Sequence, residues 1–303
     1  MKIKNIHIII NPASGKKEAI LPIINTSLKE ANIKWEAFIT HQIGQATQFA
    51  KAAVKNKVDA LAVYGGDGTI REAISGLIGS QIPLVILPGG SANVLANELN
   101  IPYDLKAACA LMSESALETK TIDIGQIDKH YFICGVTLGF GADIVEGADR
   151  DSKNRVGIIA YFFSAVKAVN KTKKTNYHLK IDGQEHKVSG LTCLITNTGN
   201  IGFSKISFDK HIDISDGLLD VLVVRKVNLS LFKHITITLF KHQRPEDWEL
   251  VKHWQGKDIS ISSTPKQTIQ CDGEILDKIP LHIKIIPSAI KILVPKKIEK
   301  PLK

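Results

Sequence analysis

A glycine-rich stretch, Gly65-Gly66-Asp67-Gly68-Thr69, places a single carboxylate in a backbone suited to phosphate. An apolar run at 58–64 precedes it, and a segment with helical spacing at 70–78 follows it. Glycine lets the backbone approach a ligand closely, and N–H groups at the start of a helix attract phosphate. Because the Asp67 carboxylate would repel phosphate, a divalent cation is expected between them. The stretch predicts a nucleotide-phosphate and Mg²⁺ site, with Glu72 facing back toward the loop; a structural strand-to-helix turn is the alternative.

Three further loops rich in Gly, Ser, Thr or Asn follow expected strands. They are Asn11-Pro12-Ala13-Ser14-Gly15 after the strand 4–10, Thr40-His41-Gln42-Ile43-Gly44 after 35–39, and Pro88-Gly89-Gly90-Ser91-Ala92-Asn93 after 83–87. Taken singly, each is also explained as a turn with a helix cap. Because ligands bind at the carboxyl ends of strands in parallel sheets, the coincidence of four such loops favours a binding site.

The elements that must position these loops alternate in type over the first hundred residues. Helical spacing covers 17–31, 45–56, 70–78 and a short segment ending at Leu99, and a strand precedes each. This alternation predicts an α/β nucleotide-binding domain, built on a parallel sheet with helices on both faces.

From about Thr121 the pattern changes to a mainly antiparallel β-sandwich domain. The expected strands are 131–136, 177–181, 191–196, 218–224, 258–263, 266–271, 281–286 and 289–294, and the expected helices are 155–169 and about 230–241. We divide the chain into residues 1–124, joined by the C-terminal segment 287–303, and residues 125–286. The final strand is a candidate for return to the first domain.

Two acidic turns in the second half could carry chemistry. Asp272-Gly273-Glu274 follows a strand, and its carboxylate could act as a general base toward an alcohol. Asp-Gly is equally a common hairpin turn, and the residue types alone favour that interpretation. Asp213-Ile214-Ser215-Asp216-Gly217-Leu218 offers two carboxylates and a carbonyl for a cation, with an ordinary loop as the alternative. The ten histidines show no ligand spacing.

Composition limits the class of protein. The chain has 303 residues, a net charge of +9 and 44% hydrophobic residues, which is typical of a globular protein. No apolar run approaches the roughly 20 residues that cross a bilayer. The four cysteines are widely separated, which favours neither zinc nor a disulfide framework. We expect a cytoplasmic protein, and we expect no nucleic acid partner; the cluster Lys171, Lys173 and Lys174 is either a solvated loop or a membrane-facing patch.

Taken together, these motifs resemble the diacylglycerol kinase catalytic family of lipid kinases. The matching pieces, in the family's order, are Asn-Pro-x-Ser-Gly at 11–15, Thr-x-x-x-Gly at 40–44, Gly-Gly-Asp-Gly-Thr-x-x-Glu at 65–72, Pro-x-Gly-Ser-x-Asn at 88–93, Ile122-Asp123-Ile124-Gly125, Asp-Gly-Leu-Leu-Asp-Val at 216–221 and Asp272-Gly273-Glu274. Gly-Gly-Asp-Gly-Thr alone is shared with NAD kinases, but the ordered set is much more specific and spans nearly the whole chain.

The resemblance implies an ATP-dependent lipid kinase with an ATP-binding first domain, a lipid-substrate second domain and an active site between them. The residues it implies for ATP are Asn11, Ser14, Gly15, Thr40, Gly66, Asp67, Gly68, Thr69, Glu72, Ser91, Asn93 and Glu274. Asp67 would act near the catalytic Mg²⁺, and Asp272 would be the general base. Asp213, Asp216 and the Leu218 carbonyl fall where some bacterial members hold a structural Mg²⁺. The partner would be a lipid at an anionic membrane surface, reached by peripheral contact with the inner face.

Two positions depart from the family pattern. Val94 stands where many members have an Asp after the Asn at 93, and His211, Ile212 and Asp213 stand where many have Pro-x-Ala before the acidic run. The first departure keeps open an inactive nucleotide- or lipid-binding regulator, and the second leaves open whether Asp213 contributes a carboxylate or a carbonyl. A soluble kinase of the NAD kinase type is the alternative enzyme. The lipid and the oligomeric state are not predicted.

Overall fold

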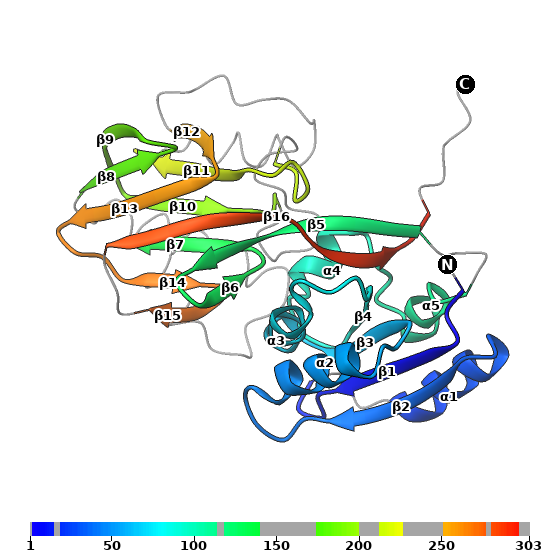
Figure 1. Ribbon diagram of the computed structural model, residues 1–303. Helices are drawn as coiled ribbons and strands as arrows, with labels where there is room; N and C mark the ends of the chain where they lie inside the picture. The colour runs from blue at the N-terminus through cyan, green and yellow to red at the C-terminus, as the bar shows by residue number, and fades with distance from the viewer. Residues whose placement is uncertain are drawn as a thin grey trace, which may run out of the picture. The chain divides into compact units, whose positions relative to one another are not determined.

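The computed structural model describes residues 2–14, 19–113, 118–139, 174–199, 212–226, 251–276 and 280–296. These form two compact units (Figure 1). Unit 1 comprises the described residues of Met1–Ile124 and Pro287–Lys303, and unit 2 comprises those of Gly125–Gly199 and Ile206–Ile286.

Unit 1 alternates strands and helices. Its elements are β1 (Asn5–Ile10), α1 (Ile20–Glu30), β2 (Lys34–Ile39), α2 (Gln45–Lys55), β3 (Ala60–Gly65), α3 (Asp67–Leu77), β4 (Leu84–Pro88), α4 (Val94–Glu98) and α5 (Leu105–Ala110). The strands pair in parallel in the order β2-β1-β3-β4. The carboxyl ends of all four therefore lie at one edge of the sheet, which is where the four loops begin.

Burial explains why these residues form a parallel sheet. Every residue of β3 is buried, and so is every residue of β1 after Asn5. Such continuous apolar strands need cover on both faces. One face packs against α1 and α5, through Ile24, Leu28 and Leu105. Helices α2 and α3 pack tightly together, since a Cβ on Gly76 would lie 2.6 Å from the Thr47 carbonyl oxygen.

Unit 2 is built from antiparallel strands. Its elements are β6 (His130–Phe132), β7 (Gly135–Gly139), β8 (Thr175–Ile181), β9 (Gln184–Gly190), β10 (Thr192–Thr196), β11 (Leu219–Val224), β12 (Val251–Gly256), β13 (Asp258–Thr264), β14 (Ile269–Cys271) and β15 (Glu274–Leu276). One sheet has the order β12-β11-β10-β7-β14-β15, and strands β13, β8 and β9 follow one another in the other. Residues of both sheets share one core. The predicted fold class, an α/β domain plus a mainly antiparallel β-sandwich domain, is confirmed.

Two long strands belong partly to each unit. Strand β5 (Glu118–Ile127) begins in unit 1, and β16 (Leu281–Val294) begins in unit 2 and ends in unit 1. In unit 2, β16 pairs antiparallel with β13; in unit 1, its Ile292 pairs in parallel with Leu84 of β4. The backbone N–H of Ser288 donates to the Asp123 carboxylate over 2.6 Å. The last strand therefore returns to the first sheet.

Several elements differ from the expectations. Helix α3 begins at Asp67 rather than Ile70, so that Asp67, Gly68 and Thr69 form its first turn. The expected strand 131–136 is broken at Ile133 and Cys134 into β6 and β7, because their backbone N–H groups donate to a side chain, Asp272, instead of continuing one strand. Strands β5 and β12 and helix α5 were not predicted. The expected helices 155–169 and 230–241 lie outside the described residues.

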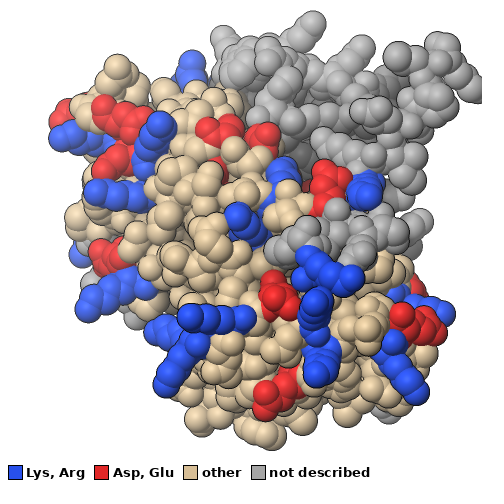
Figure 2. Space-filling model, turned by 45° about the vertical axis from the view of Figure 1, so that its right-hand side comes forward, with Lys and Arg blue, Asp and Glu red and all other residues tan. Residues whose placement is uncertain are grey.

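On the face shown in Figure 2, the charged side chains of the described residues are mixed in sign. Lys and Arg side chains lie across the visible face with Asp and Glu among them, and do not gather in one patch (Figure 2). Among the described helices, none is both long and apolar enough to cross a membrane. The cysteines are free thiols; Cys109, Cys193 and Cys271 are buried, and burial raises the pKa of Cys109 to about 12.

Candidate functional site

A pocket of about 340 Å³ opens in unit 1 at the carboxyl ends of the parallel strands. The loops after β1 and β2 and the first turns of α3 contribute to its wall. Its lining includes four of the predicted nucleotide ligands, Asn11, Thr40, Thr69 and Glu72. Segments that are far apart in the sequence thus meet at one hollow, as expected for a ligand site of a parallel sheet.

Asn11 ties the first loop to helix α3. Its Nδ2 donates to Thr69 Oγ1 over 2.8 Å, and its Oδ1 accepts from the backbone N–H of Ala13 over 3.0 Å. The N–H of Ser14 donates to the Asn11 carbonyl, which closes the turn. Asn11 and Thr69 therefore shape the pocket as a bonded pair, and Thr69 does not cap its own helix. Gly15, also predicted as a ligand, lies outside the described residues.

Glu72 holds the next loop in place. One of its carboxylate oxygens, Oε2, accepts from the backbone N–H of Gly44 over 2.9 Å and of Ala46 over 3.2 Å. These N–H groups open α2, where helices lack internal partners. Gly44 has a φ of 88°, which favours glycine. Thr40 is almost buried and its hydroxyl donates to the Ile10 carbonyl over 3.4 Å. The Glu72 carboxylate thus positions the 40–44 loop as well as lining the pocket.

The two glycine loops pack backbone against backbone. A Cβ on Gly90 would lie 2.6 Å from the Cα of Gly66, so only glycine fits there. A Cβ on Gly68, in contrast, would have no described atom within 4 Å and would face open space. The close approach at Gly90 fixes the two loops relative to each other. The open space at Gly68 leaves room for a ligand.

Asn93 closes its loop through its own side chain. It is buried with a φ of 46°; its Oδ1 accepts from Gly90 N–H over 2.9 Å and its Nδ2 donates to Gly90 O over 2.7 Å. Both ends of the amide are thus bonded within the loop, which fits a shaping role for Asn93. Ser91, in the same loop, is exposed.

Asp67 carries the unusual chemistry of the site. It is the first residue of α3, where the helix dipole favours a negative charge. Its Oδ1 is buried and has no hydrogen-bond partner among the described residues. Burial raises the pKa of the Asp67 carboxyl, and the backbone N–H groups of Val94 and Leu95 offset part of that shift. A buried carboxylate oxygen without a partner calls for an explanation, and a bound cation supplies one.

Asp272 belongs to unit 2 and lies in the turn of the β14–β15 hairpin. Cys271 pairs with Glu274, and Asp272 and Gly273 have φ values of 44° and 89°, as a two-residue hairpin turn requires. The carboxylate accepts from the backbone N–H groups of Ile133 (2.7 Å), Cys134 (2.9 Å) and Gly135 (3.0 Å). The hairpin turn and the positioned carboxylate are therefore the same feature. Glu274 is exposed at the start of β15.

The backbone that holds Asp272 is itself held by the end of β10. Thr196 Oγ1 donates to the Cys134 carbonyl over 2.9 Å, and the Asn197 backbone N–H donates to the same carbonyl over 2.8 Å. Asn197 is buried, and its Nδ2 donates to the Ile133 carbonyl over 3.3 Å. Sequence reasoning missed both residues, because Thr and Asn after a strand signal only a turn.

The acidic turn at 213–218 is exposed and internally bonded. Asp213 Oδ1 accepts from the N–H and the hydroxyl of Ser215, and Asp216 Oδ1 accepts from the N–H of Leu218. Among the described residues, no group of three or more His, Cys, Asp or Glu is arranged to hold a metal. The carboxylates of this turn bond to groups of the turn itself, which is expected of an ordinary loop as much as of a cation site. The structural Mg²⁺ therefore stays a prediction.

Comparison with protein families places both halves of the chain. Residues 5–127 match the diacylglycerol kinase catalytic domain. Residues 135–294 match the YegS C-terminal NAD kinase beta sandwich-like domain. The two matches together cover the pocket, the acidic turn and the Asp272 hairpin.

Individual relatives agree with these matches over most or nearly all of the chain. A protein named diacylglycerol kinase from Staphylococcus epidermidis is 28% identical over 97% of this chain and 93% of its own. A Staphylococcus aureus protein provisionally named a lipid kinase is 31% identical over 78% of this chain and 77% of its own. A Bacillus anthracis structure, provisionally titled a diacylglycerol kinase, is 24% identical, covers 98% of both chains and has a TM-score of 0.83, which shows a shared fold.

Proposed function

This chain belongs to the diacylglycerol kinase catalytic family, and from that premise we propose that it is an ATP-dependent lipid kinase that phosphorylates a hydroxyl group of diacylglycerol or a related membrane lipid. The observation that carries the proposal is Asp67, whose buried oxygen, unpartnered among the described residues, lies at the start of α3 beside the glycine loops. Such an oxygen suits a phosphate-bound cation, while the backbone N–H groups of Val94 and Leu95 interact with the same carboxyl group.

The loops of unit 1 would hold ATP. Pocket residues Asn11, Thr40 and Thr69 offer side-chain oxygens and nitrogens, and Gly66 and Gly68 offer close backbone approach. Ser91 offers an exposed hydroxyl. Asn93 and Glu72 would also fix the shape of the loops, through the bonds of their side chains to backbone groups. Ser14, Gly15 and Glu274 complete the proposed set.

Mg²⁺, when bound at Asp67, would supply positive charge to the phosphates. The residues present fit it, since the orphan Asp67 oxygen is a hard ligand of the kind Mg²⁺ prefers. Val94 adds no oxygen ligand at the position where the family pattern has a carboxylate, so Asp67 would carry more of this task.

Asp272 would accept the proton of the lipid hydroxyl. Three backbone N–H groups hold its carboxylate in one orientation, which a general base requires. The remaining contribution of the chain would be to position the reactants and offset charge, on which phosphoryl transfer mainly depends.

The lipid would be met at the inner face of a membrane by peripheral contact from the cytoplasm. The net charge of +9 suits anionic lipid. Within the proposed patch Lys171, Lys173 and Lys174, only Lys174 belongs to the described residues, and it is exposed.

A lipid screen tests the proposal. Purified protein is incubated with radiolabelled ATP, Mg²⁺ and a total lipid extract, and the labelled lipid is identified. D272N should lose about 10²-fold or more in turnover. Transfer of phosphate to NAD without any response to lipid would replace the proposal with an NAD kinase activity. Binding of ATP with no transfer to any lipid or to NAD would instead indicate a regulator.

A further inference from the structure

One sheet of unit 2 presents a polar face that the proposed reaction does not use. Strand β8 alternates strictly: Thr175, Tyr177, Leu179 and Ile181 are buried, while Asn176, His178 and Lys180 are exposed. Lys174 precedes the strand in the same alternation and is also exposed. The buried set packs in the core of unit 2, so the exposed set defines an outer face over β16, β13, β8 and β9 (Figure 1).

Strand register places the basic side chains of this face in two adjacent rows. In one row, Ser262, His178 and Lys187 lie on successive strands β13, β8 and β9. In the next, His282, Ser260, Lys180 and Glu185 lie on β16, β13, β8 and β9. Directly paired residues in antiparallel strands have side chains about 5 Å apart, and diagonal neighbours about 7–8 Å. Lys180 and Lys187 are such diagonal neighbours, with His178 beside both.

A shallow hollow of about 230 Å³ lies over these rows. The small residues Ser260 and Ser262 line it together with Lys180, Lys187, His178 and one acid, Glu185. A hollow with hydroxyls inside and cations around it is suited to a phosphate group, which accepts hydrogen bonds from both.

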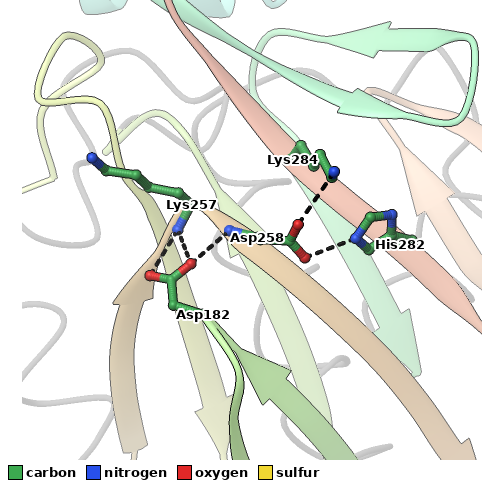
Figure 3. Close-up of polar contacts among 5 residues, drawn as sticks. All are labelled: Asp182, Lys257, Asp258, His282 and Lys284. Carbon is green, nitrogen blue, oxygen red and sulfur yellow. Dashed lines mark hydrogen bonds and ion pairs between the residues drawn. The ribbon is translucent and has the colours of Figure 1, made fainter.

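Two of the acidic groups near the hollow, Asp258 and Asp182, are already engaged by other residues. Asp258 accepts from His282 Nε2 over 2.7 Å and lies 3.4 Å from Lys284 Nζ (Figure 3). The Asp182 carboxylate accepts from the backbone N–H groups of Lys257 and Asp258 (Figure 3). The hydrogen bond from His282, with a smaller contribution from Lys284, lowers the pKa of Asp258.

Glu185 is the remaining acid of the two rows. Opposite it and diagonal to it, Lys180 and Lys187 make no ion pair with any described residue, so two lysines face one acid. The balance of these rows is therefore positive.

We propose that this face, defined by His178, Lys180, Lys187, Ser260 and Ser262, docks on the phosphate headgroups of an anionic membrane. The choice of partner rests on the proposed function, because a kinase of membrane lipids must work at such a surface. Among its described residues, the face carries no exposed Phe, Tyr or Trp on which bases could stack, which disfavours single-stranded nucleic acid. Lysines near an anionic bilayer contribute to binding in proportion to their number.

Vesicle flotation without ATP tests the docking face. The probes are vesicles of phosphatidylcholine alone and of phosphatidylcholine with about a third phosphatidylglycerol, an anionic content that attracts basic surfaces. The variant K180Q/K187Q should bind the anionic vesicles roughly tenfold or more weakly than the wild type. The matched control K252Q/K266Q removes the same charge from exposed lysines of unit 2 outside this face, and should bind like the wild type.

The flotation results distinguish the docking face from net charge and from a free-phosphate site. Equal weakening by both double variants would assign binding to net charge, and unchanged binding by K180Q/K187Q would remove the face; either result overturns the proposal. If low concentrations of inorganic phosphate release the protein from the vesicles, the face is a site for free phosphate, and the proposal is overturned. If K180Q/K187Q loses binding to an oligonucleotide but still binds the vesicles, the face is a nucleic acid site, and the proposal is also overturned. Because no turnover is measured, absence of lipid kinase activity would defeat the proposed function and leave this result standing.

Discussion

At the scale of single residues, Asp67 makes stability depend on pH in an unusual direction. Burial raises its pKa, so the unfolded chain releases this proton at lower pH than the folded protein does. Folding stability at this group is therefore lost as the pH rises from the unfolded pKa, about 4, through the raised folded pKa. In urea unfolding without Mg²⁺, we expect the free energy of unfolding of D67N to be about 1 kcal/mol or more above that of the wild type at pH 7. Below about pH 4 the two free energies should be equal.

Adding Mg²⁺ should reverse part of that difference. The cation would stabilise the wild type through Asp67 and leave D67N unchanged. D59N is the matched control, because the Asp59 carboxylate accepts from the backbone N–H groups of Lys4 and Asn5 and has no role in the pocket. It should be less stable than the wild type but keep the full Mg²⁺ response. An equal Mg²⁺ response in all three proteins would remove Asp67 from the metal site.

Thr196 offers a second residue-scale prediction, concerning the position of Asp272. Thr196 and Thr192 both lie on β10, and each hydroxyl lies 2.9 Å from a carbonyl oxygen of the neighbouring strand region, that of Cys134 and that of Leu138 respectively. The Thr196 hydroxyl also lies 2.8 Å from the Thr198 carbonyl and accepts from the Thr198 backbone N–H. T196V and T192V should each cost about 1 kcal/mol in urea unfolding. Only T196V should lower kcat, about tenfold, because only it loosens the backbone that orients Asp272.

The serine variant completes this comparison. T196S keeps the hydroxyl and should restore kcat. If T196V and T192V have the same kcat, then the Thr196 contact is structural only. If D272N keeps full turnover, Asp272 is not the general base.

At the scale of elements, the two glycine loops are expected to respond oppositely to alanine. G90A places a methyl group 2.6 Å from the Gly66 Cα, and the backbone must move, at a cost of about 1–3 kcal/mol. G68A meets no described atom within 4 Å and lies in the first turn of α3, so its stability should change little or rise by less than about 1 kcal/mol. Its methyl group would fill the open space proposed for phosphate. Calorimetric titration should therefore show weaker ATP binding by G68A, and unchanged affinity would place the nucleotide elsewhere.

Element types were predictable where periodicity was strong. Strands β1, β3 and β4 of unit 1 are largely buried apolar runs, and each is followed by a loop rich in Gly, Ser, Thr or Asn, so the sheet edge that bears these loops follows directly from the pattern. The start of α3 was misplaced because Gly66 and Gly68 lower the helix propensity of this stretch. In the structure, Gly66 is the N-cap with an extended backbone, and the helix begins at Asp67. Strand β12 was missed because its polar residues Lys252, His253 and Gln255 obscure the alternation.

The supporting contacts of the site could not be predicted from residue types. Nothing in Thr196-Asn197 indicates that these residues bind the backbone at 133–135, since the partners are about sixty residues away and the contact depends on β7 pairing with β10. The same holds for Glu72, which was predicted as a nucleotide ligand and is found bonded to the start of α2. Motifs indicate which residues gather at a site, whereas tertiary pairing decides which of them hold the others in place.

At the scale of the whole molecule, unit 1 depends on residues from the far end of the chain. Ile290, Ile292 and Leu293 of β16 are buried, and Leu293 belongs to the core of unit 1. Truncation after Ile286 should destabilise unit 1 by several kcal/mol, since each lost apolar side chain is worth about 2 kcal/mol or more. Limited proteolysis should then cut unit 1 rapidly. Truncation after Lys296 keeps these residues and should leave the proteolysis pattern unchanged; resistance of both truncated proteins would contradict the prediction.

The divided strand β16 also has a consequence for synthesis on the ribosome. Strands β1 to β4 all lie within the first 124 residues, yet β16, which pairs with β4, is synthesised only after the strands of unit 2. At typical translation rates the delay is roughly ten to thirty seconds, far longer than helices and hairpins take to form. During that interval β4 offers an open, apolar edge to any neighbouring nascent chain. The newborn protein is therefore expected to need a chaperone until its synthesis is complete.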